Sequence, residues 1–541
     1  MELCIVRSAR CCAAGWVWGL LVALCLASGC TSDERTVPEG AFQQEPEPED
    51  EVNNGQDPPV DEEEPEPQVP EGPLRATLTH SFGQYNLEPF EETSPCVSWT
   101  LNNDEPIYVE RVTLSNSGSY HHSNWFVVPE DEYPGRDGFW RCRSRDFQEV
   151  EAALLGTVLF AQSTQSLVES QHLGDGVVIK IPPRHKVVAD VHMLNLAPRE
   201  QATELRMALD LVHPHEVETV VTPFRLSYLD LTIPGRSRSL HTSDCMLRRP
   251  YERTARRDYD IKLYWVLPHY HQLGDYFKLE IIGGPRDGEV IYELEGFNAD
   301  ANGKAFEEPL DLSDSDGLRF TCGYTNTGVR SVGWGIGDQE MCVMLGFMDA
   351  GALIDASVIQ GSEVVEVDGN TVYNQGPCSA YGLPRNAAQT MPTDEERKAP
   401  LYVPEGNGPD ELAPVIDCQD TPTDAVAEAP VSFESIQNTI FAVGCAFNAC
   451  HDAEAPAATL PLVGDGAYDA LLAHPARGNR DMPMITPGDP DQSWLYQIIS
   501  RCEPTNHDGE VVAHMPLNAP TLMDPELVAK VRDWITAGAP Q

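Results

Sequence analysis

Between Leu74 and about Gly382 the chain alternates short apolar segments with polar turns. Representative segments are VVADVHML, KLEIIGG and GEVIYELEGF, and Gly, Pro, Asn and Asp separate such segments at close spacing. Apolar runs this short, bounded by turn-forming residues, are typical of β-strands. The pattern predicts an all-β sandwich fold for this part of the chain.

The hydrophobic pattern becomes helical in the closing segment, 431–541. Ser432 is suited to cap a first helix, and apolar residues at helical spacing follow it. Asp524 and Pro525 open another helix with a single apolar face, which Gly538 ends. The chain therefore combines a mainly β part with a small helical domain.

The N-terminus has the pattern of a lipoprotein signal. Two arginines precede an apolar run (13–26), and small residues then lead to Cys30 in ASGC. A transmembrane anchor is the alternative, but the run is shorter than the roughly 20 residues that a spanning helix needs. We expect a signal peptide at 1–29 and lipidation of Cys30. The protein would be exported, periplasmic or at the cell surface, and anchored by lipid to a bacterial outer membrane.

A stretch rich in Pro and Glu, 30–73, follows the signal and is expected to form an extended tether. It contributes heavily to the formal net charge of -49, which argues against nucleic acid as a partner. A second Pro-rich, acidic stretch (391–414) marks the last domain boundary. We expect two β domains at 74–225 and 226–385, a linker at 386–430 and the helical domain at 431–541.

The most informative polar residues are histidines that interrupt apolar segments. In LPHYHQLG, which follows IKLYWV, a strand would place His269 and His271 on one face, as two ligands of one metal require. An isolated pair of this kind is more often solvent-facing. Upstream lie His121 and His122, whose joint ligation needs a bend or bulge, or a strand end, and His192.

A sulfur ligand changes the choice of metal. GDQEMCVML supplies the thioether of Met341. Imidazoles suit copper or zinc, and a thioether favours copper because soft sulfur stabilises Cu(I). A zinc hydrolase is the alternative, but a thioether is a poor zinc ligand.

These motifs occur in a recognisable order. Adjacent HH, then VH, then HxH, then EMC on β-rich sequence resembles the copper type II, ascorbate-dependent monooxygenases, the family of peptidylglycine α-hydroxylating monooxygenase and dopamine β-monooxygenase. The resemblance covers roughly 74–382 and is most specific in LPHYHQLG, FTCGYTNTG and GDQEMC. It implies two tandem antiparallel jelly-roll domains, each holding one copper.

The resemblance also implies a role for each ligand. His121, His122 and His192 would hold the electron-transfer copper, and His269, His271 and Met341 the oxygen-binding copper, which is the catalytic site. Hydroxylation of a C–H bond with O2 takes two electrons, and each Cu(I) gives one. His185 and His241 have no assigned role and are expected to be structural or exposed.

Disulfides are expected as well. Of the 15 cysteines, four leave with the signal and Cys30 takes lipid, so ten remain in an exported protein. The resemblance suggests a Cys322–Cys342 bond that would hold Met341 in place. Bonds between Cys245 and Cys378 and between Cys96 and Cys142 are looser expectations.

The substrate is expected to differ from that of the peptide hydroxylase. In that relative, an arginine two residues before HxH and an asparagine and a tyrosine after EMC hold the substrate carboxylate. Here those positions are Leu267, Val343 and Leu345, which offer no polar side-chain group. A more apolar or aromatic small molecule is therefore expected.

The tail carries a second redox signature, GCAFNACH, in which Cys445, Cys450 and His451 form C-x4-C-H. Covalent haem c needs two thiols and an adjacent imidazole, although the common spacing is C-x2-C-H and an ordinary disulfide is the alternative. The rest of the tail resembles small cytochrome c-like modules of bacterial exported proteins. Met515 would be the distal ligand, with His514, Met482 and Met484 as alternatives.

The sequence thus predicts a copper-dependent monooxygenase with two copper ions and one covalent haem c. Its partners would be a small-molecule substrate, O2 and an external electron donor, with the haem passing electrons to the coppers. The membrane would be contacted through the lipid anchor only. A non-catalytic copper-binding or electron-transfer lipoprotein is the alternative.

Overall fold

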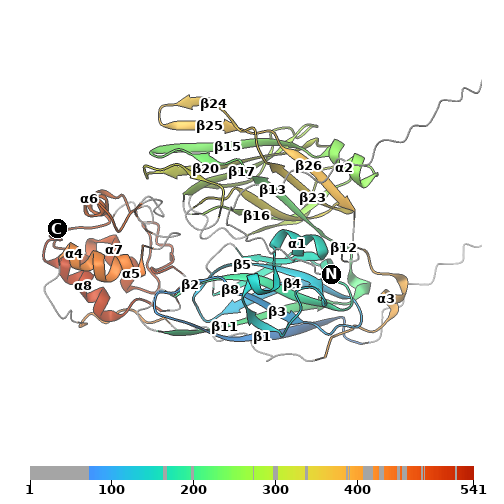
Figure 1. Ribbon diagram of the computed structural model, residues 1–541, viewed down its shortest axis with the longest axis horizontal. Coiled ribbons are helices and arrows are strands. Elements are labelled where there is room, and N and C mark those ends of the chain that lie inside the picture. The colour runs from blue at the N-terminus through green and yellow to red at the C-terminus, as the bar shows by residue number, and fades with distance from the viewer. Residues whose placement is uncertain are drawn as a thin grey trace, which may run out of the picture. The chain divides into compact units, whose positions relative to one another are not determined.

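The computed structural model describes residues 72–541, except 163–166, 196–199, 272, 296–302, 336–338, 385–387, 389, 406–417, 426–431, 447–450, 452, 454–459, 477–478, 480–481, 518 and 520. The signal peptide, Cys30, the tether and Cys450 lie outside the described residues. The described chain is mainly β, as the apolar pattern predicts, with helices concentrated after residue 432 (Figure 1).

The strands up to residue 220 form a first β region of two six-stranded sheets (Figure 1). One sheet has the order β1 (Arg75–Leu87), β11 (Gln201–Val212), β4 (Ile107–Asn116), β9 (Val177–Ile181) and β12 (Thr219–Val220), with β8 (Val168–His172) also paired to β4. The other has the order β6 (Gly138–Trp140), β3 (Cys96–Thr100), β10 (His185–Leu194), β5 (Tyr120–Pro129) and β7 (Thr157–Gln162), with β2 (Glu92–Thr93) paired to β10.

The strands from 222 to 384 form a second β region, again with two six-stranded sheets. The first has the order β19 (Lys304–Asp311), β16 (Lys262–His269), β22 (Val343–Asp349), β13 (Thr222–Tyr228), β23 (Ala352–Val358) and β26 (Ser379–Pro384). The second has the order β18 (Val290–Glu295), β17 (Gly274–Ile282), β20 (Gly317–Asn326), β15 (Ser237–Met246), β25 (Thr371–Gln375) and β24 (Glu363–Asp368). A small pair, β14 (Thr232–Ile233) and β21 (Val332–Gly333), completes the region.

The sheets are mostly, but not wholly, antiparallel. Among the strands that the structure describes, three pairs are parallel: β12 with β9, β13 with β23, and β15 with β25. Parallel neighbours need long connections, and each of these pairs joins strands that are distant in sequence. The chain passes from the first region to the second between β12 and β13, so the expected boundary at 225/226 falls inside β13.

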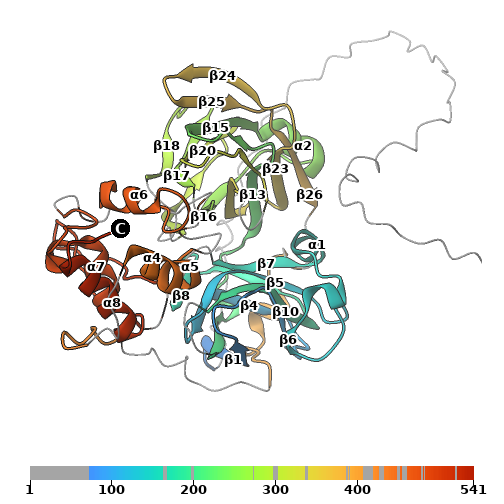
Figure 2. The ribbon, with the colours of Figure 1, turned by 60° about the vertical axis from the view of Figure 1, so that its left-hand side comes forward.

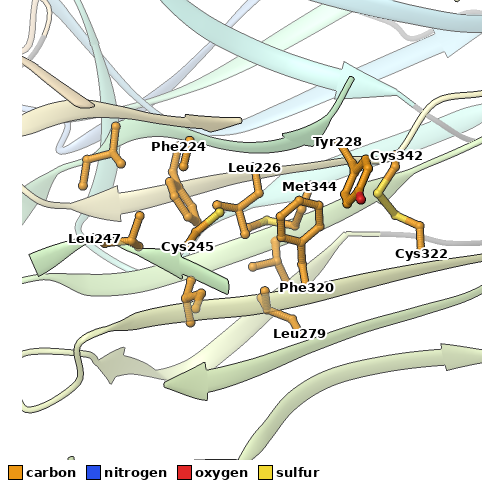
Figure 3. Close-up of a cluster of buried hydrophobic side chains, with 14 of the residues drawn as sticks. Phe224, Leu226, Tyr228, Cys245, Leu247, Leu279, Phe320, Cys322, Cys342 and Met344 are labelled. Atoms are coloured by element: carbon orange, nitrogen blue, oxygen red, sulfur yellow. A yellow bond between two sulfur atoms is a disulfide. The ribbon is translucent and has the colours of Figure 1, made fainter. Parts of the chain in front are cut away.

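Each β region has its own apolar core, because alternate residues of its strands face inward. In β10, Val187, Ala189 and Val191 enter the first core, which leaves His192 on the other face. The second core contains Phe224, Leu226 and Phe320, as Figure 3 shows. The first cluster also includes Trp265, Leu267 and Phe347 of β16 and β22.

Four disulfides crosslink the described chain. Cys96–Cys142, Cys245–Cys378 and Cys322–Cys342 are the three expected bonds and are confirmed. The sequence did not indicate the fourth, Cys418–Cys502. Four disulfides are consistent with an exported protein.

Helices are short in the β regions: α1 (Glu149–Leu155), α2 (Arg248–Ala255), α3 (Asp394–Lys398) and the 3-10 turns Cys142–Arg145 and Pro214–Glu216. The helical region contains α4 (Phe433–Ile436), the π-helical turn Gln437–Phe441, α5 (Ala442–Gly444), α6 (Ala467–Ala473), the 3-10 turn Pro490–Gln492, α7 (Trp494–Ser500) and α8 (Pro525–Thr536). Helices α4, α7 and α8 share one apolar core (Figure 2).

The expected helix ends of this region are confirmed. The Ser432 hydroxyl accepts a hydrogen bond from the Ser435 N–H at 3.1 Å, and Asp524 accepts one from the Glu526 N–H at 2.9 Å. Gly538, with φ of 93°, follows the last helix. Among the described residues, no helix combines the length and the apolar character that a membrane crossing requires.

Candidate metal centre

A register shift of the kind that joint ligation by the adjacent histidines would need is present in the backbone. In the β10–β5 pair, His192 lies opposite His122, whereas the next residue, Met193, lies opposite Tyr120. His121 is therefore the extra residue of a β-bulge, which releases neighbouring side chains from strict alternation. The side chain of His121 lies outside what the structure describes, so its ligation stays a prediction.

His122 and His192 come together at this bulge. The Nε2 of His122 lies 3.1 Å from the Nδ1 of His192, and the two ring centroids are 4.8 Å apart. The other nitrogen of His192, Nε2, lies 2.9 Å from a carboxylate oxygen of Glu92 on β2. A carboxylate accepts a hydrogen bond, so Nε2 carries the proton and donates it to Glu92, which leaves the Nδ1 lone pair directed toward His122.

The second pair of imidazoles lies where β16 ends. The sequence predicts one strand through both histidines. In the structure, His269 is the last residue of the strand and His271 follows in a turn, so that prediction is wrong. The ring centroids are nevertheless 5.2 Å apart. Gly274 closes the turn by donating to the carbonyl of His271 at 3.0 Å, and a Cβ at Gly274 would lie 1.9 Å from the Tyr270 ring. Only glycine fits this turn.

Main-chain groups and one buried carboxylate fix the position of His271. Its Nδ1 donates to the carbonyl of Gln339 at 2.7 Å, so Nε2 carries the lone pair. Glu340 accepts the N–H of His271 at 2.8 Å and the N–H of Leu273 at 2.6 Å. Burial lowers the pKa of His271, which favours the neutral imidazole that a metal needs. Burial also raises the pKa of Glu340 to about 8, opposed by these hydrogen bonds.

Met341 follows Glu340 directly and is anchored on both sides. Its carbonyl accepts the Tyr324 hydroxyl at 2.6 Å. Its neighbour Cys342 is bonded to Cys322 of β20, and both cysteines are fully buried beside Tyr228 (Figure 3). Met341 is half-buried and lies two residues from the carbonyl that holds His271.

The two pairs of imidazoles form one continuous group. The rings of His122 and His269 have centroids 6.0 Å apart, so the pairs lie closer than two well-separated metal sites would. Two ligand atoms of one tetrahedral metal lie roughly 3.3 Å apart, which the nitrogens of His122 and His192 nearly match. Imidazoles with fixed tautomers, supported by a carboxylate and a carbonyl, are the usual surroundings of a transition-metal ion. The spacing of the His122 and His192 nitrogens suits two ligands of one metal, whereas the contacts described do not place the sulfur of Met341, so the two copper sites stay a prediction.

Leu267, Val343 and Leu345 stand at the positions where the peptide hydroxylase has polar side chains that hold its substrate, and they offer no polar side-chain group here. Leu267 is buried among Trp265 and Phe347, and Leu345 packs against the same cluster. Val343 is also buried. These residues therefore provide no anchor for a carboxylate.

The two unassigned histidines have structural settings. His241 is fully buried, with neither nitrogen in a hydrogen bond, and its ring packs against Tyr228 and Tyr324. His185 is half-buried, and its Nδ1 donates to the Pro183 carbonyl at 2.8 Å.

In the helical region the predicted haem residues border the apolar core. Cys445, Met482 and Met515 pack against this core, and Met484 is part of it. The Nδ1 of His451 donates to the carbonyl of Leu460 at 2.9 Å, which leaves the lone pair on Nε2, the nitrogen that ligates haem iron. Burial lowers the pKa of His514. Cys450 lies outside the described residues, so C-x4-C-H as a haem motif stays a prediction.

Sequence reasoning missed two supporting carboxylates. Glu340 stands inside EMC and is followed by the apolar run Met341–Leu345, which is a signal, on that side only, that it is buried. Glu92 offers no such signal, because it is 100 residues from His192.

No family model matches the chain, and no curated protein matches it. Among solved structures, a protein of Parabacteroides distasonis ATCC 8503 described as secreted is 9% identical, with 53% of this chain and 92% of that chain covered and a TM-score of 0.15. An archaeal virus protein described as a triple jelly roll is 9% identical, with 50% and 60% covered and a TM-score of 0.15. The VP2 subviral particle of infectious bursal disease virus is 8% identical, with 53% and 74% covered and a TM-score of 0.13. TM-scores this low carry no argument about function.

Proposed function

We propose that the chain is an exported copper-dependent monooxygenase that hydroxylates a C–H bond of a small apolar or aromatic substrate. In this proposal the two β regions are tandem jelly-roll domains, and the helical region is a cytochrome c-like module. The observation that carries the proposal is the convergence of His122, His192, His269 and His271 from two β regions into one group of rings.

The residues around the group support a redox metal rather than a structural one. Bound copper would supply one-electron chemistry and the activation of O2 that C–H hydroxylation needs. His271 would enter the site as a neutral ligand through Nε2, because the Gln339 carbonyl holds its other nitrogen. Glu340 ties the HxH turn to the segment that carries Met341, and in this proposal the thioether of Met341 would join the imidazoles as a ligand.

Substrate selection in this proposal depends on burial of apolar surface. Leu267, Val343 and Leu345 bring no charge to the site, so neither an acidic nor a zwitterionic substrate gains an ion pair from them. An apolar or aromatic molecule leaves no polar group of these three side chains without a partner, because they have none.

Copper analysis and oxygen uptake on the full chain test the proposal. We expect two copper ions per chain and ascorbate-dependent O2 consumption. The double variant His269→Ala/His271→Ala should lose one copper and its O2 consumption, whereas His185→Ala, which lies outside the ring group, should keep both. O2 consumption by the double variant at the wild-type rate would refute the assignment. Copper binding without any O2 consumption by the wild type would favour the electron-transfer alternative.

The haem part of the proposal has its own test. Pyridine haemochrome spectra should show one covalent haem c per chain in the wild type and none in Cys445→Ala. If the haem supplies electrons to the copper ions, His451→Ala should slow their reduction. Stopped-flow experiments on the full chain, with the same electron donor for both proteins, measure this rate. Equal reduction rates in the wild type and His451→Ala would remove the electron-supply role.

A further inference from the structure

A second cluster of metal-ligating side chains lies in the first β region, outside the ring group. Glu110, His172 and Asp175 each direct one ligand atom to a common point, and these atoms all lie within 4.8 Å of one another. The Nε2 of His172 is 3.9 Å from an oxygen of Glu110 and 3.7 Å from an oxygen of Asp175. None of the predicted copper or haem ligands belongs to this cluster.

The backbone holds these three residues together. Glu110 and Arg111 are consecutive on β4, and Arg111 lies opposite His172, the last residue of β8. The turn after β8 then brings Asp175 back over the imidazole. Gly176 makes this turn possible, because its φ is +70° and a Cβ there would lie 2.8 Å from the Glu216 carbonyl. Its N–H donates to Glu110 at 2.8 Å and orients the carboxylate.

The imidazole points to a missing ligand. The Nε2 of His172 is buried and has no hydrogen-bond partner in the described chain, although two carboxylates face it. Distances of 3.7 and 3.9 Å are too long for hydrogen bonds. They exceed the spacing between two ligands of one metal by only about half an ångström. A buried polar atom without a partner is costly unless something else satisfies it.

The formal charges of the cluster match a divalent cation. Glu110 pairs with Arg75, and Arg75 also pairs with Glu216 at 3.4 Å. Three carboxylates (Glu110, Asp175 and Glu216) and one guanidinium (Arg75) give the acidic and basic side chains a formal charge of −2. The Glu110 side chain is 6% exposed, whereas that of Asp175 is 92% exposed, which leaves one side of the cluster open to solvent.

We propose that Glu110, His172 and Asp175 form a site for a divalent transition-metal ion of the zinc type. An imidazole with two carboxylates suits Zn2+ and does not suit Ca2+, which takes oxygen ligands. Bound metal would fasten the turn between β8 and β9 to β4. This site is independent of the monooxygenase proposal, since it uses none of the same residues.

Equilibrium dialysis of the full chain against Zn2+, followed by metal counting, tests the site. Any Zn2+ taken up by the ring group would be the same in every protein compared, because none of the variants changes its residues, so differences report this cluster alone. Asp175→Asn and His172→Gln should each bind one Zn2+ fewer than the wild type. The matched controls Asp131→Asn and His185→Gln should bind the wild-type number.

Melting temperatures show whether a variant loses zinc because it fails to fold. Zn2+ should raise the Tm of the wild type more than that of Asp175→Asn, whose side chain is exposed and whose Tm without metal should be unchanged. Loss of one Zn2+ in both variants would support the site. Retention of the wild-type zinc count in either variant would overturn it.

Discussion

The two pairs of imidazoles are supported in different ways. His271 is held by the Gln339 carbonyl, by the buried carboxylate of Glu340 and, behind these, by the Cys322–Cys342 bond. In contrast, the described support of His192 includes the side chain of Glu92, which is 35% exposed. The first arrangement is part of the protein core, and the second lies near the end of β10, an interior strand of its sheet.

The difference indicates a difference in precision. Main-chain groups and buried carboxylates position a ligand to a fraction of an ångström, as a reaction centre requires. An exposed side-chain contact permits more adjustment, which an electron-storage site tolerates. The comparison therefore favours the second pair, with Met341, as the proposed reaction centre.

The largest effect is expected for Glu340→Ala. This variant leaves the buried N–H groups of His271 and Leu273 without acceptors, which should lower the free energy of unfolding by about 4 kcal/mol. Urea denaturation measures this loss. Glu366→Ala, which changes an exposed glutamate, is the control. A loss below about 1 kcal/mol would show that the carboxylate does not stabilise the turn.

Removal of the Cys322–Cys342 bond should have the next largest effect. The bond closes a loop with a sequence separation of 20, and the double serine variant should lose about 3 kcal/mol of stability. It should also weaken Cu(I) binding at the Met341 site. The Cys96–Cys142 double serine variant is the matched control in the first region, where stability should fall but Cu(I) binding at Met341 should not. Equal Cu(I) affinities at the Met341 site in the two double serine variants would show that the Cys322–Cys342 bond does not support this site.

His241 should make the second core sensitive to acid. Burial lowers its pKa from 6.5 to about 4, so the unfolded chain binds a proton more readily than the folded chain. Protonation of the unfolded chain therefore does not lower the free energy of unfolding above pH 6.5. As the pH falls from 6.5 toward 4, this free energy decreases, and the decrease reaches about 2 kcal/mol at pH 5.

Denaturation midpoints at pH 7.5 and pH 5 check this expectation. His241→Leu should show a smaller difference between the two midpoints than the wild type does. His80, which stacks on Trp99 in the first region and also has a pKa lowered to about 4 by burial, contributes equally to both proteins. An unchanged pH dependence in His241→Leu would contradict the interpretation of His241 as a buried neutral imidazole.

The smallest effect is expected for Glu92→Gln. Loss of the carboxylate that faces His192 should weaken copper binding at the first pair about tenfold and leave the second pair unaffected. Competition titration with a Cu(I) chelator resolves the two affinities, and Glu105→Gln is the control. Weakening of both sites would show that the ring group acts as one unit.

Local features were predictable from the sequence, whereas supporting contacts were not. Strand alternation shows that joint ligation by His121 and His122 would need a bend, a bulge or a strand end, and the caps at Ser432 and Asp524 follow from residue type at a helix start. The parallel strand pairs, the Cys418–Cys502 bond and the contact between Glu92 and His192 join residues far apart in sequence. No periodicity or short motif encodes such pairs, because register and long connections decide them.

X-ray absorption at the copper edge of the reduced full chain tests the central claim most directly, namely that imidazoles and the Met341 sulfur share a redox metal. The account predicts nitrogen scattering together with one copper–sulfur contribution in the wild type. The sulfur contribution should vanish in Met341→Ile, while the nitrogen scattering remains. A wild-type spectrum without sulfur, or identical spectra for both proteins, would contradict the account.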